Sequence, residues 1–222
     1  MKIAIVIPAF NEARTIANVI RSVIDQGTVI VVDDNSKDGT GSIATKEGAV
    51  VVSHKKNRGY DAALQSGFER ASQLKMDAVI TFDADGQHES SILHRFISIL
   101  VSGEVELVIG IRPEYARLSE AIFNKYVKIR FGINDILCGL KGYKMNLFYQ
   151  NGRFDGGSSI GTELALYGLR RKISIATVPV FIHQREDRPR FGSWFSSNGR
   201  ILRAFILAIW NDLKCIKIKK IK

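Results

Sequence analysis

The sequence predicts an α/β fold, in which a Rossmann-like, mostly parallel β-sheet is flanked by helices. Three observations predict it. Short apolar runs alternate with helix-like segments along the first half of the chain, as expected for parallel strands joined by crossover helices. The 222 residues are enough to bury a full hydrophobic core. Hydrophobic residues make up 45% and charged residues 24% of the chain, which is typical of a globular domain.

The first two elements set a pattern that the next ones repeat. Residues 3–7 form a continuous apolar run, typical of a strand covered on both faces. Residues 15–25 then place apolar side chains at helical spacing. The same alternation predicts, in order, strand 28–32, helix 40–47, strand 49–53, helix 61–74, strand 78–82, helix 91–100 and strand 107–110.

The chain is less regular from about Pro113 onward. The elements expected there are helix 120–131, loop 132–142, helix 162–170, strand 173–180, basic loop 185–197 and a final helix 199–213. We therefore expect a single domain with a less regular C-terminal part.

The charge of the chain indicates an anionic partner. Lysine and arginine number 32 against 22 aspartate and glutamate residues, which gives a net charge of +10. Nucleic acid, a phosphorylated ligand or an acidic membrane would each suit this balance. No apolar run reaches the roughly 20 residues that span a bilayer, and the N-terminus lacks the pattern of a signal peptide. With two cysteines far apart in the sequence, we expect a cytoplasmic protein.

Asp83 and Asp85 directly follow predicted strand 78–82, at the edge of the sheet where α/β proteins bind ligands. Two carboxylates at this spacing can point at one cation, helped by an amide oxygen or water. Mg²⁺ and Mn²⁺ prefer such oxygen ligands and share them with substrate phosphates. The alternative is a solvated acidic turn closed by Gly86.

Two further polar segments end predicted strands at the same edge. Segment 33–40 contains the adjacent residues Asp33 and Asp34. An Asx turn and a helix cap explain part of this segment, but they do not require two adjacent aspartates. A carboxylate there can accept hydrogen bonds from a nucleotide base or ribose. Segment 8–12 ends the first strand, and by itself it is weaker evidence for a ligand-binding site.

Together, these segments resemble the family 2 glycosyltransferases with the GT-A fold, and more closely the dolichol-phosphate mannose synthase and polyprenyl-phosphate sugar transferase branch. The stretches that carry the resemblance are 7–12, 31–40, 57–63, 82–88, 110–112 and 135–141. The chain departs from the branch at Trp194, where a lysine is usual, and at Glu89, where a proline is common. Both departures bear on the identity of the acceptor more than on that of the donor.

The resemblance implies an inverting, metal-dependent transfer of a sugar from a nucleotide-diphospho-sugar to an acceptor, with polyprenyl (dolichyl or undecaprenyl) phosphate as the leading acceptor. A saccharide acceptor in cell-surface polysaccharide or glycan synthesis is the alternative within the family. A basic nucleic-acid-binding module is the alternative of another class. The chain has no recognisable motif for it, so we expect no nucleic acid partner.

The resemblance also implies roles for individual residues. The nucleotide-sugar is expected to contact Pro8, Ala9, Phe10, Glu12, Asp34, Asp83, Ala84, Arg112 and Arg190. Mg²⁺ or Mn²⁺ is expected to bind Asp83, Asp85 and Gln87, where it neutralises charge on the leaving nucleoside diphosphate. The residues expected in catalysis are Asp85, Glu163 and Arg188. Arg188 and Arg190 belong to a basic loop expected to close over the phosphates.

Several other polar residues have a structural interpretation beside the functional one. Asp135 is either a structural loop residue or a sugar or acceptor contact. The four histidines show no metal spacing, so we expect ordinary surface or loop residues, with His88 the one nearest a site. An acceptor phosphate is already anionic, so no strong base is required of Glu163.

The chain is expected to divide into a GT-A domain, 1–198, and a C-terminal amphipathic helix with a basic tail, 199–222. Within the domain, 1–112 is the expected nucleotide-sugar half and 113–198 the acceptor half. The apolar residues from Ile201 to Ile216 are spaced as one helical stripe. This stripe is expected either to pack on the domain or to lie on the cytoplasmic face of an anionic membrane without crossing it.

Overall fold

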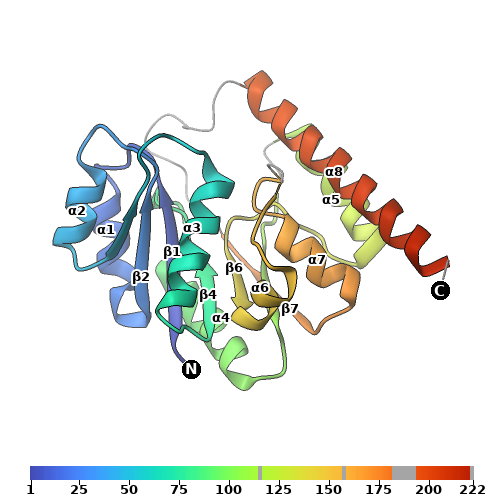
Figure 1. The fold of residues 1–222 in the computed structure, drawn as a ribbon, viewed down its shortest axis with the longest axis horizontal. Helices are drawn as coiled ribbons and strands as arrows, with labels where there is room; N and C mark the ends of the chain where they lie inside the picture. Colours follow the sequence, from blue (N-terminus) through green and yellow to red (C-terminus); the bar gives the residue numbers. More distant parts are fainter. Residues whose placement is uncertain (115–116, 157–158, 182–193, 221–222) are drawn as a thin grey trace.

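One seven-stranded sheet lies at the centre of the fold (Figure 1). The computed structural model describes residues 1–114, 117–156, 159–181 and 194–220. Its strands are β1 (Ile3–Ala9), β2 (Thr28–Asp33), β3 (Val50–Ser53), β4 (Ala78–Thr81), β5 (Leu107–Ile111), β6 (Lys141–Lys144) and β7 (Ile175–Pro179). They are ordered β3-β2-β1-β4-β6-β5-β7. Only β6, among these seven, runs antiparallel to its neighbours β4 and β5. The mostly parallel sheet is thus confirmed.

Helices cover both faces of the sheet. They are α1 (Ile16–Val23), α2 (Thr40–Lys46), α3 (Tyr60–Gln73), α4 (Leu93–Ser102), α5 (Leu118–Phe131), α6 (Met145–Asn151), α7 (Glu163–Arg171) and α8 (Trp194–Lys220), with short 3₁₀ turns at Ile24–Gln26 and Ser90–Ile92. Apolar residues of α1, α2 and α4 form one core, and those of α3 and α5 to α8 form the other.

The two cores explain why the first strand is apolar throughout. Ile5 and Ile7 pack in the core beside α1, whereas Ala4 and Val6 pack in the core beside α3. Successive side chains of a strand point to opposite faces, and both faces are covered here, so no position tolerates a polar residue.

Two elements lie where the sequence analysis expected none. β6 begins at the end of predicted loop 132–142, and α6 follows it directly. The sequence of β6, Lys-Gly-Tyr-Lys, has no apolar run that signals a strand. Gly142 suits the sheet because a Cβ there would lie 2.9 Å from Leu100 Cδ1. The final helix begins at Trp194, so the expected division of the chain after residue 198 falls inside α8.

Candidate functional site

The loops after β1 and β2 are hydrogen-bonded to each other. Asn11 N donates to Ser36 Oγ at 2.8 Å, and Lys37 N donates to Asn11 Oδ1 at 2.8 Å. Glu12 N donates to Thr40 Oγ1 at 2.9 Å. Asn11 has a φ of 55°, a left-handed conformation that asparagine adopts more readily than most residues. These contacts hold the carboxyl ends of two neighbouring strands as one rigid edge.

The residues predicted to line the nucleotide lie along this edge. Ala9, Glu12 and Ala84 are buried, whereas the Phe10 side chain is 38% exposed just beyond the end of β1. An exposed aromatic ring at the carboxyl edge of a parallel sheet is available to a ligand there. Its contact with a nucleotide stays a prediction.

Asp34 is buried, and three groups of the chain surround its carboxylate. Arg58 N donates to Oδ1 at 2.8 Å, and Gly59 N donates to Oδ2 at 2.7 Å. His54 Nδ1 lies 2.6 Å from Oδ1, while its Nε2 lies 2.9 Å from Ser66 Oγ. Asp34 therefore fixes the backbone that leads into α3, and its contact with a nucleotide stays a prediction.

His54 lies in the loop after β3, as expected of a surface or loop residue, but its side chain is not at the surface. Its side chain is only 5% exposed. Burial is tolerated because both ring nitrogens lie within hydrogen-bond distance of polar partners, Asp34 and Ser66. The partners come from β2's end and from α3, so no local sequence pattern could have revealed them.

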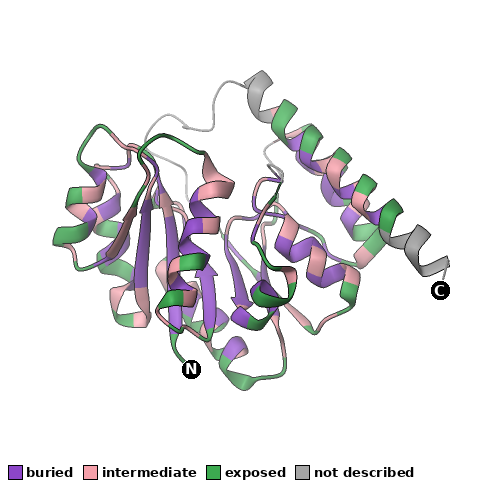
Figure 2. Ribbon diagram, in the orientation of Figure 1, coloured by how far each residue is buried: buried purple, intermediate pink, exposed green. Residues whose placement is uncertain are grey.

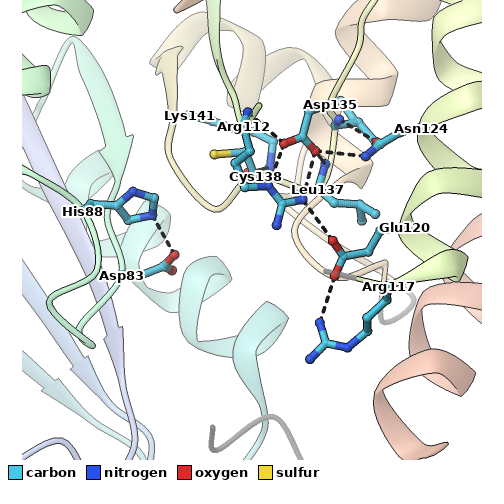
Figure 3. A network of polar contacts seen from close by, with 11 residues as sticks. Asp83, His88, Arg112, Arg117, Glu120, Asn124, Asp135, Leu137, Cys138 and Lys141 are labelled. Atoms are coloured by element: carbon cyan, nitrogen blue, oxygen red, sulfur yellow. Dashed lines mark hydrogen bonds and ion pairs between the residues drawn. The ribbon is translucent and has the colours of Figure 1, made fainter. Parts of the chain in front are cut away.

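Asp83 follows β4 and lies among three groups, of which Tyr60 and Gly139 come from distant parts of the chain and His88 from the same loop. Tyr60 Oη donates to Oδ1 at 3.4 Å. His88 Nε2 lies 3.2 Å from Oδ2, and Figure 3 shows this contact. Gly139 passes so close that a Cβ there would overlap the carboxylate. Burial alone would raise the pKa of Asp83, but His88, Lys141 and the Tyr60 hydroxyl together lower it. Asp83 is therefore held as a carboxylate.

Asp85 and Gln87 lie two and four residues further on, in the turn closed by Gly86. Gln87 N donates to Asp85 Oδ1 at 3.1 Å. Within the described part of the chain, no three His, Cys, Asp or Glu side chains converge as a ready-made metal cage. Mg²⁺ and Mn²⁺ sites that serve phosphate chemistry often take one or two carboxylates and complete their shell with phosphate and water. The donor set Asp83, Asp85 and Gln87 fits such a cation, bound together with a diphosphate.

Arg112 was expected to contact phosphate, but its side chain is bound to Asp135. Nε donates to Oδ2 at 2.7 Å, and Nη2 donates to Oδ1 at 3.1 Å (Figure 3). Nη2 also lies 3.5 Å from Glu120 Oε2. Burial would raise the pKa of Asp135, but Arg112 lowers it, so the pair is ionised. Asp135 is fully buried, which fits its structural interpretation, and the phosphate contact of Arg112 stays a prediction.

Tyr60 and Lys141 also lie at the site, although the sequence indicated no role for either residue. Tyr60 reaches Asp83 from the start of α3. Lys141 is buried at the start of β6, where Nζ donates to the backbone oxygen of Cys138. Burial lowers the pKa of Lys141, and the nearby Asp135 and Asp83 carboxylates act against that shift. Only β6, the strand without an apolar signal, brings this cation to the site.

Glu163, at the start of α7, is paired with the loop before it. Its Oε1 accepts from Arg153 Nε at 2.9 Å, and its Oε2 accepts from Gly156 N at 2.7 Å. It lines a cavity of about 160 Å³ between α7 and α8. Both carboxylate oxygens of Glu163 are thus engaged by the chain itself, and a catalytic role of Glu163 stays a prediction. Arg188 and Arg190 lie outside the described residues.

A larger cavity, of about 490 Å³, opens between the start of α3 and the first turns of α8. The charged residues that line it are Arg58, Asp61, Asp155, Arg200 and Arg203. Burial and the charge of Asp155 raise the pKa of Asp61 to about 6. The three arginines make the cavity suited to an anionic group, and the two carboxylates can accept hydrogen bonds from hydroxyl groups.

The family model described as "Glycosyl transferase family 2" matches residues 4–156. Among curated proteins, the UDP-N-acetylglucosamine–dolichyl-phosphate N-acetylglucosaminyltransferase of Methanococcus voltae is 30% identical over 129 residues, which cover 50% of this chain and 51% of that protein. The polyprenol monophosphomannose synthase of Mycolicibacterium smegmatis is 25% identical over 206 residues, covering 82% and 77%. The chain spans between 51% and 64% of the length of several curated relatives that it matches.

Among solved structures, glucosyl-3-phosphoglycerate synthase from Mycobacterium tuberculosis, in complex with Mn²⁺, UDP and glucosyl-3-phosphoglycerate, has a similar fold. The TM-score is 0.75 with 22% sequence identity, and the match covers 95% of this chain and 79% of that one. This likeness supports the fold that the sequence predicted.

Proposed function

The chain belongs to glycosyl transferase family 2, and we propose that it transfers a sugar, with inversion, from a nucleotide-diphospho-sugar to a polyprenyl phosphate. The observation that carries the proposal is the Asp83 carboxylate at the end of β4. It is kept ionised, and its side chain is 29% exposed, so a cation can reach it. Asp85 and Gln87 follow in the same turn, at the edge where such sheets bind ligands.

For the donor, we propose that the nucleotide lies along the edge formed by the loops after β1 and β2. Pro8, Ala9, Phe10, Glu12, Asp34 and Ala84 are the proposed lining residues. Asp83, Asp85 and Gln87 would hold Mg²⁺ or Mn²⁺ against the diphosphate. When bound, such a cation neutralises charge on the leaving nucleoside diphosphate. The Mn²⁺ and UDP named for the structural neighbour agree with this proposal.

For the acceptor, we propose that the phosphate enters the cavity lined by Arg58, Arg200 and Arg203. Arginine binds phosphate oxygens through paired N–H donors, so three arginines around one cavity suit a phosphate monoester. Relatives named for dolichyl phosphate, undecaprenyl phosphate and polyprenol support the lipid form of that phosphate. Such an acceptor is already anionic, so the transfer requires no strong base from the chain.

The experiment is an acceptor panel with the full chain, Mn²⁺ and a set of UDP- and GDP-sugars. Release of nucleoside diphosphate is measured with undecaprenyl phosphate in detergent, with 3-phosphoglycerate, with a free oligosaccharide, and with no acceptor. We expect undecaprenyl phosphate alone to raise the rate well above the acceptor-free rate. Stimulation by the oligosaccharide or by 3-phosphoglycerate alone would contradict the lipid acceptor while keeping the donor site.

A matched pair of variants locates the acceptor. Arg203→Ala removes a cation from the cavity wall, whereas Lys128→Ala removes an exposed cation from α5 outside the cavity. We expect Arg203→Ala to raise the KM for undecaprenyl phosphate about tenfold, as the loss of a charge-assisted hydrogen bond predicts. Lys128→Ala should leave the KM in detergent unchanged. Equal effects of the two variants would remove the cavity from the proposal.

A further inference from the structure

Helices α5 and α8 are packed side by side (Figure 1). The Phe205 ring lies 5.5 Å, centroid to centroid, from both Phe123 and Tyr126 of α5. Tyr126 Oη donates to Asp212 Oδ2 at 2.6 Å. Aromatic packing and a part-buried hydrogen bond thus join the two helices at Phe205 and, two turns further on, at Asp212. Ile201 of the predicted stripe is buried in the domain core, together with Ala204 and Ala208 of the same helix.

The other part of the stripe is not covered. On α8, four large apolar residues at helical spacing are each more than half exposed, namely Leu202, Ile206, Trp210 and Leu213. On α5, Leu118, Ile122 and Ile129 share one helical face and are also exposed. Figure 2 shows the exposed side of α8 turned away from the rest of the molecule. These seven residues form what we call the outer face.

Exposed apolar residues are concentrated in the outer face. Of the twelve large apolar residues that are exposed within the described part of the chain, seven belong to it. Single exposed apolar residues are ordinary on any protein surface. A cluster on two adjoining helices is not, and it indicates contact with another apolar surface.

The charges around the outer face identify the kind of surface. Each of the two helices has one acidic residue, and both are buried. Glu120 is paired with Arg112 and Arg117, and Asp212 with Arg130 and Arg170. The exposed cations are Lys125, Lys128, Arg130, Arg200, Arg203 and Lys214. Neither helix therefore presents an exposed carboxylate among its described side chains.

We propose that the outer face of α5 and α8 rests on the surface of an anionic lipid bilayer, with its apolar side chains in the interface and its cations against lipid phosphates. An interfacial helix pair of this kind combines apolar burial with attraction to anionic headgroups. A second copy of the chain would bring cations against cations, which disfavours a dimer through this face. Of the described helices, none is both long enough and apolar enough to cross a bilayer.

The proposal deepens the proposed function, on which its biological meaning rests. Arg200 and Arg203 line the larger cavity, and Leu202 and Ile206 lie on the same helix in the outer face. A lipid phosphate held at the bilayer surface would therefore meet the arginines of the cavity without leaving the bilayer.

The test is co-sedimentation of the full chain with vesicles of phosphatidylcholine and phosphatidylglycerol, and with vesicles of phosphatidylcholine alone. Ile206→Glu and Ile129→Glu each place a carboxylate on the outer face, one on each helix. Val101→Glu, on α4, is the matched control, because Val101 is 52% exposed and Ile206 58% exposed. The fold of each variant is checked by its thermal unfolding midpoint, and its mass in solution by light scattering.

We expect binding to the anionic vesicles that weakens as salt is added, and weaker binding to the neutral ones. Each outer-face variant should reduce the partition coefficient by about tenfold, since apolar burial and headgroup attraction are both lost. Val101→Glu should bind like the unchanged protein. Equal binding of all three variants, or no binding at low salt, would overturn the proposal. A dimer that the outer-face variants dissociate would also overturn it.

Failure of this proposal and failure of the proposed function are distinguishable. In detergent, where no bilayer surface exists, transfer to undecaprenyl phosphate should be the same for Ile206→Glu and Val101→Glu. Vesicle binding without transfer in detergent would support the membrane contact of the outer face and contradict polyprenyl phosphate as the acceptor. Transfer in detergent without vesicle binding would contradict the proposed membrane contact and support the proposed acceptor.

Discussion

The backbone of Gly139 lies against the carboxylate of Asp83, and a Cβ atom at position 139 would overlap both carboxylate oxygens. Gly139 precedes β6, which is antiparallel to β4, so the sheet itself brings the two residues together. The close approach restricts where the Asp83 side chain can point. The geometry of the proposed cation site therefore requires a glycine at position 139.

Gly139→Ala should therefore impair the site more than the fold. We expect the affinity for the nucleotide-sugar in the presence of Mn²⁺ to fall at least about tenfold, because a displaced ligand loses much of its charge stabilisation. The matched control is Gly199→Ala in α8, where no atom lies within 4 Å of the added Cβ. That control should keep its affinity and gain up to about 1 kcal/mol of stability from helix propensity. Isothermal titration and thermal unfolding measure the two effects.

Asp85→Ala should abolish transfer while the protein stays folded. Losing one cation ligand removes several kcal/mol of transition-state stabilisation, so kcat/KM should fall by about a hundredfold or more. Asp77, at the other end of β4, is the control, since its carboxylate lies away from this turn and accepts from Lys2 N at 2.6 Å. Transfer rates of the two alanine variants make the comparison. Full activity of a folded Asp85→Ala variant would remove this turn from the site.

Asp34→Ala should weaken donor binding and also destabilise the fold. The backbone N–H groups of Arg58 and Gly59 and the ring of His54 would lose their partner. Leaving buried donors unpaired costs about 1–3 kcal/mol. We expect a higher Kd for the nucleotide with a smaller change in the rate of the bound complex, because this residue is remote from the reacting carbon. An unchanged Kd with a reduced kcat would refute this role.

The pair Asp61 and Asp155 predicts a pH dependence of stability. The pKa of Asp61 rises from 3.8 to about 6, first through burial and then through the charge of Asp155. The pKa of Asp61 is thus higher in the folded protein than in the unfolded chain, so protonation of Asp61 favours the folded state. This stabilisation is complete below pH 3.8 and is lost as the pH rises through about 6. The loss amounts to at most about 3 kcal/mol.

Asp155→Asn should reduce this loss. Removing the neighbouring charge lowers the pKa of Asp61 toward its ordinary value, although the effect of burial remains. Urea unfolding at several pH values between about 4 and 7 measures the free energy of unfolding of both proteins. An unchanged slope in the variant would show that Asp155 does not influence Asp61.

The sequence was sufficient for the parallel part of the sheet, because buried strands such as β1 and β2 are continuous apolar runs. It was insufficient for β6, whose four residues include two lysines and a glycine. The residues of the candidate site differ in the same way. Asp83, Asp85 and Asp34 could be found because each follows a recognisable strand. Tyr60, His54 and Lys141 could not, because only tertiary packing brings them to their partners.

The C-terminal helix shows a further limit of sequence patterns. The apolar residues from Ile201 onward read as a single stripe, for which packing on the domain and contact with a membrane were alternatives. In the structure the stripe is wide enough for both, since Ile201 is buried while Ile206 and Leu213 are exposed. A pattern of spacing gives the width of an apolar face, and only the packed neighbours show how much of it is covered.

The central claim is that this chain glycosylates a polyprenyl phosphate. Its most direct test is mass spectrometry of the lipid extract after the full chain is incubated with undecaprenyl phosphate, Mn²⁺ and a panel of nucleotide-sugars. We expect a new species heavier than undecaprenyl phosphate by one dehydrated sugar, absent when EDTA is added and absent with Asp85→Ala. If every nucleotide-sugar leaves the undecaprenyl phosphate mass unchanged while Mn²⁺ and the sugar donor remain bound, the claim is contradicted.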